Sequence, residues 1–302
     1  MRCVVASAPA SYAMRAVAAA LALAACASCA HGPSAGGPKP AAAARHTSIE
    51  PDSATVALWR LDESVGVEVG DSGPLGLNAT AGPDTRPDFG RQGRARLFTN
   101  SVNSFVYLPF HPSLNAGDAF TVEAWINPGD FGNFEDTPIV ARWFPDILQT
   151  SWMLSIVGRN TRDPEHTGSG EHLPLIQLGQ TGKLMFAFMP DDAGIPRSYF
   201  SSRPLELSRW THVAASYDGR VVRIYLDGLL DAQYASPGRI RDSEAPLFIG
   251  NDFDPRWLTG FGGDLRCGPN ADPFPYYAFQ GLIDEVRISS AARAEFRYAR
   301  GG

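Results

Sequence analysis

The sequence predicts an all-β fold, an antiparallel sandwich of two sheets, and three observations lead to it. From residue 55 onward the apolar residues recur mostly with a period of two rather than 3.6, as in strands that bury one face. Asp-Gly pairs separate β-type runs, and both residues of such a pair tolerate the positive φ of tight hairpin turns. No helical pattern of useful length occurs before residue 290, and strands without intervening helices form antiparallel layers.

Two runs show the strand pattern most plainly. In Phe120–Ile126 the apolar side chains stand at even positions and therefore face one way. Lys183–Phe188 is apolar on both parities, which indicates a central strand buried on both faces. Ser290–Tyr298 is the one stretch whose pattern predicts a short terminal helix.

The clearest turn signals follow residue 210. Trp210–Tyr217 is followed by Asp218-Gly219, then by Val221–Leu226 and by Asp227-Gly228. Asp-Gly between β-type runs favours a hairpin. Two such turns in succession predict a three-stranded meander.

Composition restricts the class of protein. The chain has 302 residues, of which 44% are hydrophobic and 19% charged, as in an ordinary soluble globular protein. A sandwich of this size is usually a single domain. The formal net charge of −6 repels phosphate backbones, so we expect no nucleic-acid partner. The 30 Gly and 24 Pro residues suit many short strands joined by turns.

The N-terminus has the pattern of an export signal. Residues 1–15 are weakly basic, and Ala16–Ala25 is an apolar run too short to span a bilayer comfortably. The run closes with Leu23-Ala24-Ala25-Cys26, which resembles a bacterial lipobox. We predict a lipoprotein signal peptide over residues 1–25 and a lipidated Cys26. The alternatives are a plain secretory signal cut near Ala30 and, for the start of translation, Met14 in place of Met1.

The segment after Cys26 is predicted to be a tether. Residues 26–54 are rich in Ala, Gly and Pro and bury too little surface to offset their conformational entropy. The β-sandwich domain is expected over residues 55–302. Acyl chains on Cys26 would attach the protein stably to a membrane. The predicted location is the bacterial cell envelope, on the periplasmic or the outer surface.

The cysteines predict no metal site and leave one disulfide pairing open. Cys29 and Cys267 remain once the signal peptide and the lipidated Cys26 are set aside. They could pair in an oxidising compartment, and that question stays open. The one CxxC, Cys26-Ala27-Ser28-Cys29, begins at the predicted lipidation site. No second CxxC accompanies it, so we expect no zinc site.

Five phrases resemble the laminin G-like jelly roll of the concanavalin A-like superfamily. They are Val56–Glu63 with Asp71-Ser72-Gly73, Phe120–Ile126, Trp210–Val213 running into Tyr225–Gly228, Leu247–Gly250, and Gly281–Ile288. They stand in the family's order and span residues 55–297. The resemblance implies a jelly roll whose first and last strands lie side by side. It also implies binding of carbohydrates, glycoconjugates or proteins, although a fold does not fix a function.

The resemblance further implies a structural calcium near the junction of the first and last strands. In the last expected strand Asp284 shares its parity with Val286, so we expect its carboxylate on an apolar face, where it needs partners. Asp62 and Asp71 follow the first strand, and carboxylate oxygens suit calcium. Two readings stay open. Either these three carboxylates hold a stabilising calcium, or Asp284 bonds backbone amides or an arginine such as Arg60.

No phrase in the sequence predicts catalysis. Glycosidases of this superfamily place paired carboxylates on one strand, as in Glu-x-Asp-x-x-Glu, and that phrase does not occur. Asp284 and Glu285 are adjacent and are therefore expected to face opposite ways. Asp252 and Asp254 share a parity but have no third acid in register. We predict a protein without catalytic residues.

Two segments are longer than the fold requires, Arg142–Trp152 and Asn251–Phe279. Long loops in a compact domain are commonly functional, and flat aromatic faces beside carboxylates suit sugar rings. The alternative is that these aromatics pack as a satellite core, because exposed apolar clusters are costly. The predicted ligand contacts are Trp143, Trp152, Asp252, Asp254, Trp257, Tyr276 and Tyr277. Trp143 and Trp257 are the foremost of them.

These features together predict a membrane-anchored, non-catalytic binding module. Its expected partner is a glycan or a cell-envelope or extracellular protein, recognised through loops of the sandwich. The alternatives are a divergent glycosidase or polysaccharide lyase of the same superfamily, and a purely structural envelope lipoprotein.

Overall fold

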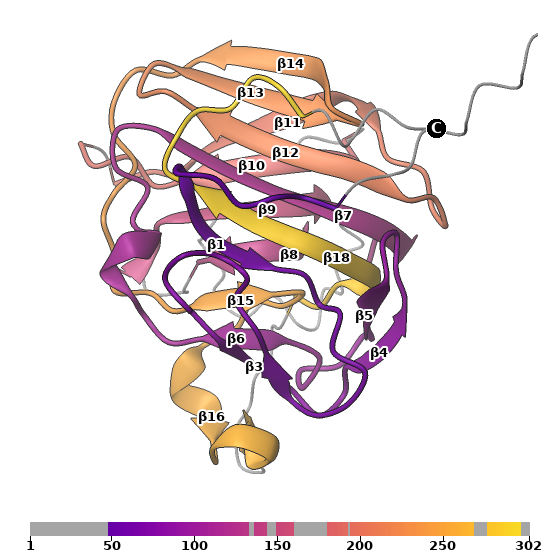
Figure 1. The fold of residues 1–302 in the computed structure, drawn as a ribbon. Coiled ribbons are helices and arrows are strands. Elements are labelled where there is room, and N and C mark those ends of the chain that lie inside the picture. Colours follow the sequence, from indigo (N-terminus) through magenta and orange to yellow (C-terminus); the bar gives the residue numbers. More distant parts are fainter. Residues whose placement is uncertain are drawn as a thin grey trace, which may run out of the picture. The chain divides into compact units, whose positions relative to one another are not determined.

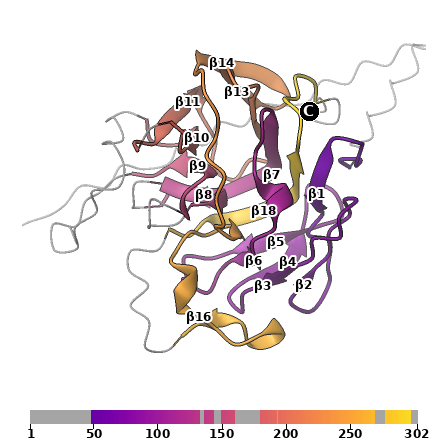
Figure 2. The same ribbon diagram turned by 90° about the vertical axis from the view of Figure 1, so that its left-hand side faces the viewer.

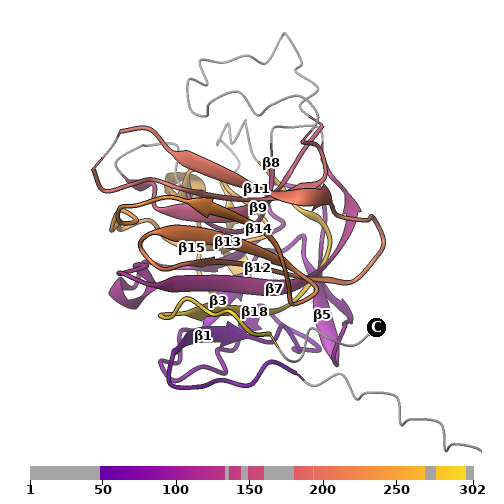
Figure 3. The ribbon, with the colours of Figure 1, turned by 90° about the horizontal axis from the view of Figure 1, so that it is seen from above.

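The computed structural model describes residues 48–132, 136–143, 149–159, 180–192, 194–268 and 277–296. Within these residues two large antiparallel sheets face one another (Figures 1 and 3). The all-β sandwich predicted from the sequence is confirmed. The signal peptide, Cys26, Cys29 and Tyr276 lie outside the described residues. In the described part of the chain no helix has the length and apolar character needed to cross a membrane.

Sheet A contains both the first and the last strand. Its order is β14-β13-β12-β7-β18-β5-β4, and β1 pairs with β18 beside that path. The bounds are β1 Thr55–Trp59, β4 Arg86–Phe89, β5 Arg94–Phe98, β7 Phe120–Asp130, β12 Thr211–Tyr217, β13 Val221–Leu226, β14 Leu229–Ala235 and β18 Gln280–Ser289.

Sheet B lies opposite sheet A, with the order β11-β10-β9-β8-β15-β6-β3-β2. Its bounds are β2 Glu68–Val69, β3 Ala79–Ala81, β6 Val106–Leu108, β8 Asp136–Arg142, β9 Trp152–Val157, β10 Lys183–Phe188, β11 Arg197–Pro204 and β15 Leu247–Ile249. A small separate sheet pairs β16 (Leu258–Thr259) with β17 (Arg266–Cys267). The short 3-10 helices whose bounds fall within the described ranges include η1 Pro112–Leu114, η3 Pro255–Trp257 and η4 Gly262–Asp264.

The main core fills the space between the two sheets. Side chains of alternate residues along each strand enter it, and the even-numbered apolar positions predicted for β7 all do so. Strand β10 is buried on both of its faces, and it pairs with β9 on one side and β11 on the other. Both predictions are confirmed.

The meander predicted after residue 210 is confirmed as β12, β13 and β14. Asp227 has a φ of 53° and Gly228 a φ of 72°. Two successive residues with positive φ are typical of the hairpin turn whose twist matches that of the flanking strands. The loop between β12 and β13 differs, since there only Gly219 has a positive φ.

The first and last strands lie side by side, as the resemblance implies, because β1 pairs antiparallel with β18. Strand β18 also contains a bulge. Glu285 has a φ of 47°, and the register against β7 shifts between Asp284 and Arg287. A bulge reverses the alternation of faces along a strand, so Asp284 lies opposite Trp125 on the outer face while Val286 enters the core. The expectation that Asp284 shares an apolar face with Val286 is therefore wrong.

Residues 48–54 pack along the outer face of sheet A. Ile49 is 0% exposed, and its backbone N–H donates to a Glu285 carboxylate oxygen at 2.9 Å. The Glu50 carbonyl accepts a hydrogen bond of 3.0 Å from Arg287. The sequence assigns these residues to the tether because they are poor in large apolar groups. The correction is that one buried isoleucine and these backbone hydrogen bonds join residues 48–54 to the fold.

The last described residues of the chain, 290–296, also cross this face, and they contain no helix. The helix predicted for Ser290–Tyr298 is therefore wrong over its described part. The Thr121 hydroxyl donates to the Ala291 carbonyl at 2.6 Å and accepts from the Arg293 N–H at 2.9 Å. These contacts hold the segment against β7 by backbone groups that a helix would pair internally.

An aromatic cluster also covers part of the outer face of sheet A. Phe296 is buried against Trp125 and Tyr225, and Trp210 packs at the edge of the same cluster. The ring centroids of Phe296 and Tyr225 are 4.9 Å apart. Both terminal segments of the described chain thus cover sheet A on the side away from the core.

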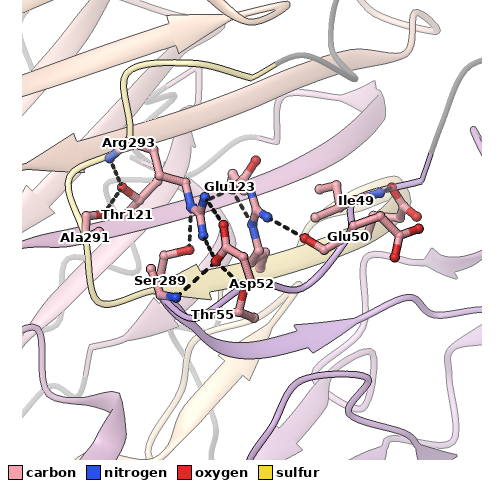
Figure 4. A network of polar contacts seen from close by, with 12 residues as sticks. Ile49, Glu50, Asp52, Thr55, Thr121, Glu123, Ser289, Ala291 and Arg293 are labelled. Carbon is pink, nitrogen blue, oxygen red and sulfur yellow. Dashed lines mark hydrogen bonds and ion pairs between the residues drawn. The ribbon is translucent and has the colours of Figure 1, made fainter.

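Glu123 of β7 is the centre of a buried charged network beneath these segments (Figure 4). Glu123 is 0% exposed, and its Oε1 lies 2.7 Å from Nε and 2.6 Å from Nη2 of Arg287. Its Oε2 lies 3.0 Å from Nε2 of His212, which is also fully buried. Arg293 lies 3.9 Å from Oε1 and donates two hydrogen bonds to Asp52. Through Glu123 three strands and both terminal segments are joined.

Replacing one partner of this buried pair should destabilise the protein strongly. We expect Arg287→Ala to lower the free energy of unfolding by about 3–5 kcal/mol, because it leaves the Glu123 carboxylate buried and short of its partner. Urea denaturation measures this. Arg223→Ala is the matched control, since Arg223 pairs with Asp218 on the surface, and an exposed pair contributes about 1 kcal/mol or less. Equal losses for the two variants would contradict the assignment.

Candidate functional site

The outer face of sheet B carries two adjacent hydrophobic clusters. The methionine cluster consists of Ala141, Met153, Val157, Met185 and Ala187, with Trp143 and Phe200 packed against it. The phenylalanine cluster consists of Phe105, Phe248, Phe253 and Cys267, with Val102, Tyr107, Trp257, Leu258 and Leu265 packed against it. Ala141 and Phe248 are register partners between β8 and β15, so the two clusters adjoin. Each has one of the two foremost predicted tryptophans at its border.

Trp143 follows the end of β8 and is half-buried. The residue before it, Arg142, is 0% exposed, and its guanidinium donates to the carbonyls of Leu114, Ser243 and Ala245 at 2.8, 2.7 and 3.1 Å. Burial lowers the pKa of Arg142 to about 10, so the group stays charged at neutral pH. Arg142 therefore fixes the end of β8, and with it the backbone position of the adjacent Trp143. The sequence marks Arg142 only as the start of a long loop.

Asn251 closes the base of the long insertion after β15. It is 0% exposed, and its side-chain amide donates to three carbonyls of residues 101–104 at 3.1, 3.4 and 3.1 Å. The backbones of Asp252 and Tyr277 exchange two hydrogen bonds of 3.2 and 3.3 Å. The insertion thus leaves and rejoins the sandwich at one fixed point. Tyr277 is half-buried there.

Residues 255–268, called the arm below, lie beside β3 and β6 (Figures 1 and 2). Asp254 caps η3 by accepting the Arg256 N–H at 2.8 Å, and it forms an ion pair with the Arg256 guanidinium at 2.6 Å. Trp257 at the end of η3 is half-buried against the phenylalanine cluster. The satellite core expected for the insertion is confirmed for Phe253, which is 1% exposed, and in part for Trp257.

Cys267 of β17 ties the arm to the body. It is buried in the phenylalanine cluster, and its backbone N–H donates to the Asn103 side chain at 2.8 Å. Burial raises the pKa of its thiol, which makes the thiolate scarce at neutral pH. Cys267 is a free thiol among the described residues, and the partner considered for it, Cys29, lies outside them.

Asp252 is a buried acid beside a second one, Asp136 of β8. Asp252 is 6% and Asp136 5% exposed. Burial, and secondarily the negative charge of Asp136, raise the pKa of Asp252 well above its ordinary value. One Asp252 oxygen, Oδ1, has no hydrogen-bond partner. The burial of both groups keeps a glycosidic bond from reaching them together, so we assign this pair to the structure of the insertion's base.

The structure places the remaining predicted ligand contacts, Trp152, Asp254 and Tyr276, in three different situations. Trp152 is 0% exposed in the main core, with its ring centroid 4.6 Å from that of Phe120, so its prediction as a ligand contact is wrong. The sequence places Trp152 in a loop, whereas β9 begins at that residue and turns its side chain inward. The carboxylate of Asp254 is occupied by Arg256. Tyr276 lies outside the described residues.

Of the three acids considered for calcium, Asp71 accepts backbone donors on both of its carboxylate oxygens. Its carboxylate accepts the N–H groups of Leu58, Gly73 and Leu77 at 2.8, 2.6 and 2.8 Å. Asp62 is exposed and accepts the Arg94 N–H at 2.6 Å. Both carboxylates thus accept backbone amide hydrogens.

Asp284 lies beneath the turn between β4 and β5. It is 0% exposed, and its Oδ2 accepts the Gln92 N–H at 3.0 Å while its Oδ1 has no partner. Burial raises its pKa to about 8, the backbone hydrogen bond opposes this, and the charges of Glu285 and Asp62 add to it. The described residues contain no group of three His, Cys, Asp or Glu side chains that could hold a metal ion. Asp284 accepts a backbone amide, as the alternative reading has it, and calcium binding by Asp62, Asp71 and Asp284 stays a prediction.

The comparisons with known proteins agree with this architecture. A laminin G family model, described as the concanavalin A-like lectin/glucanases superfamily, matches residues 100–295. The chain belongs to this family. A search of the curated proteins found no match.

Solved structures show the same fold. The binding domain of Paraclostridial Mosquitocidal Protein 1 has a TM-score of 0.52 and 14% identity, covering 80% of this chain and 49% of that one. The receptor binding domain of botulinum neurotoxin type G has a TM-score of 0.50 and 13% identity, covering 80% and 49%. A botulinum neurotoxin type C structure has a TM-score of 0.51 and 10% identity, covering 80% and 48%. The chain spans about half the length of these structures, and at such identities they show the fold alone.

The raised pKa of Asp284 predicts a pH-dependent stability. In the folded protein the group keeps its proton up to about pH 8, whereas in the unfolded chain it ionises near its ordinary value. Between these limits the folded state binds more protons, so this group's contribution to stability is full at low pH and falls by about 1.4 kcal/mol per pH unit as pH rises. Asp284→Asn does not titrate.

We therefore expect the melting temperature of Asp284→Asn, relative to the parent protein, to rise by several degrees between about pH 5 and pH 8. Thermal unfolding of both proteins across this range measures the difference. Parallel curves at every pH would contradict a protonated Asp284.

Proposed function

We propose that this chain is a non-catalytic glycan-binding module and that it recognises its ligand with the outer face of sheet B. The observation that carries the proposal is the placement of Trp143 and Trp257. Both are half-buried at the borders of the two adjoining clusters on that face. An aromatic side chain that packs on one side and reaches solvent on the other can stack on the C–H face of a sugar ring at little entropic cost.

The two faces of the sandwich differ in what covers them. Residues 48–54 and 290–296 close the outer face of sheet A through Glu123 and Phe296. A tether that precedes residue 48 would therefore join the domain on the side of sheet A. Recognition by sheet B then places the ligand on the face opposite the attachment.

We further propose that Cys26 carries a lipid anchor and that the domain is held at the bacterial cell envelope. The lipobox-like sequence Leu23-Ala24-Ala25-Cys26 supports this, as does the short apolar run before it. The Ala/Gly/Pro-rich residues that follow suit a tether between the membrane and the sandwich.

The comparisons support recognition rather than chemistry. The family is named for lectins as well as glucanases, and two of the similar structures are a binding domain and a receptor binding domain by name. For botulinum neurotoxin type C, entry into cells depends on interaction with two ganglioside molecules. An extracellular protein partner is the second candidate, because loops of the same face could contact a protein surface.

A glycan array with the full chain tests the proposal. We expect binding to at least one glycan class, and Trp143→Ala and Trp257→Ala should each weaken it about tenfold, since an aromatic contact contributes about 1 kcal/mol or more. Trp210→Ala is the matched control, because Trp210 is equally half-buried but packs on the outer face of sheet A. Binding to an envelope protein and to no glycan would favour the second candidate. Equal loss in all three variants would contradict the assignment to sheet B.

The anchor has its own test. Cys26→Ser should move the protein from the membrane fraction to the soluble fraction and abolish incorporation of labelled fatty acid, since the sulfur of Cys26 is the expected attachment point. Cys29→Ser is the control and should leave both unchanged. Membrane association that survives Cys26→Ser would refute the proposed anchor.

A further inference from the structure

The tip of the arm presents an aromatic ring that the fold does not use. Phe261 is 93% exposed, and Gly260 precedes it while Gly262 and Gly263 follow it. These glycines leave the ring without neighbouring side chains on either side in sequence. The apolar ring of Phe261 is therefore accessible to a ligand.

The arm holds this tip in a defined conformation. Leu258 pairs with Cys267 and Thr259 with Arg266, and the base of this hairpin packs in the phenylalanine cluster. The Asp264 N–H donates to the Phe261 carbonyl at 3.0 Å and closes the turn.

Gly260 cannot be replaced freely. It has a φ of +82°, and a Cβ atom there would lie 2.3 Å from the Asp264 carbonyl oxygen. The sequence thus specifies this turn, and Phe261 projects from a fixed base. A backbone turn that is already formed loses less conformational entropy when Phe261 binds.

The same turn carries a pair of opposite charges. Asp264, in the same turn, has its side chain 85% exposed, and Oδ1 lies 3.1 Å from Nη2 of Arg266, whose side chain is 49% exposed. A carboxylate accepts hydrogen bonds and a guanidinium donates them. A flat ring in the same turn as such a pair matches the two parts of a sugar, which are its C–H face and its hydroxyl groups.

Charge decides among the possible occupants. Asp264 neutralises Arg266, so the tip offers no free cation to a sulfate, a uronate or an anionic lipid headgroup. The chain's net charge of −6 opposes such groups further. We propose that Phe261, with the Asp264–Arg266 pair, is a second contact for the glycan, beyond Trp257, and that the ligand is an uncharged polysaccharide. This inference rests on the proposed function and specifies its substrate class.

The test measures the affinity of the full chain for a panel of neutral polysaccharides and their acidic counterparts by affinity electrophoresis. Phe261→Ala should weaken binding to the neutral ligand about tenfold, and Phe261→Trp should keep it. Phe89→Ala is the matched control, since Phe89 is 84% exposed but lies in β4 of sheet A, and it should bind as the parent does. Melting curves of all variants should coincide, because the Phe261 side chain packs against so little.

The outcomes separate the inference from the function on which it rests. If the parent protein binds no glycan, the proposed function falls and the inference with it. If the parent binds and Trp257→Ala weakens it while Phe261→Ala does not, the function stands and the inference is overturned. Stronger binding to acidic than to neutral polysaccharides, or Phe261-dependent binding to phosphatidylglycerol vesicles without glycan, would also overturn it.

Discussion

A single buried carboxylate, that of Glu123, organises the attachment of both terminal segments to the sandwich. Its two oxygens engage Arg287 of β18 and His212 of β12, and Arg293 links it to Asp52 of the N-terminal segment. An ionised carboxylate inside a protein is tolerated only when it is paired and hydrogen-bonded. The charge on β7 therefore requires the segments that supply and surround its partners to stay in place.

Because of this constraint, the outer faces of the two sheets have different roles. Sheet A carries the first strand, the last strand and the terminal segments, and its outer face is covered by them. The long insertion packs on the outer face of sheet B. Asn251 fixes the base of this insertion, and Arg142 fixes the backbone next to Trp143. Because recognition benefits from side chains held in place before binding, these buried polar anchors connect the fold to the proposed function.

Much of the fold could be predicted from the sequence because local patterns specify it. The even positions of Phe120–Ile126 enter the core, and Asp227-Gly228 adopts the expected turn. The bulge at Glu285 could not be predicted, since one residue with positive φ leaves no trace in an alternating pattern. Nor could the packing of Ile49, because its contacts come from residues more than 200 positions away.

The candidate site was harder to predict than the fold. Aromatic content identified the two segments that border the outer face of sheet B, but not which rings are buried in the core. Trp152 begins strand β9 and its side chain is buried, whereas the side chain of Phe261 is exposed at a glycine-rich turn. That difference depends on where strands start and on tertiary packing, which composition does not encode. The burial of Asp252 beside Asp136 likewise depends on the pairing of β8 with β15.

Hydrogen–deuterium exchange of the full chain, with and without the glycan that an array selects, tests the central claim most directly. The account predicts that ligand slows exchange in residues 255–268 and in the described residues around Trp143, and leaves residues 48–54 and 290–296 unchanged. Protection confined to the two terminal segments, with the arm unaffected, would place the ligand on sheet A and contradict the account.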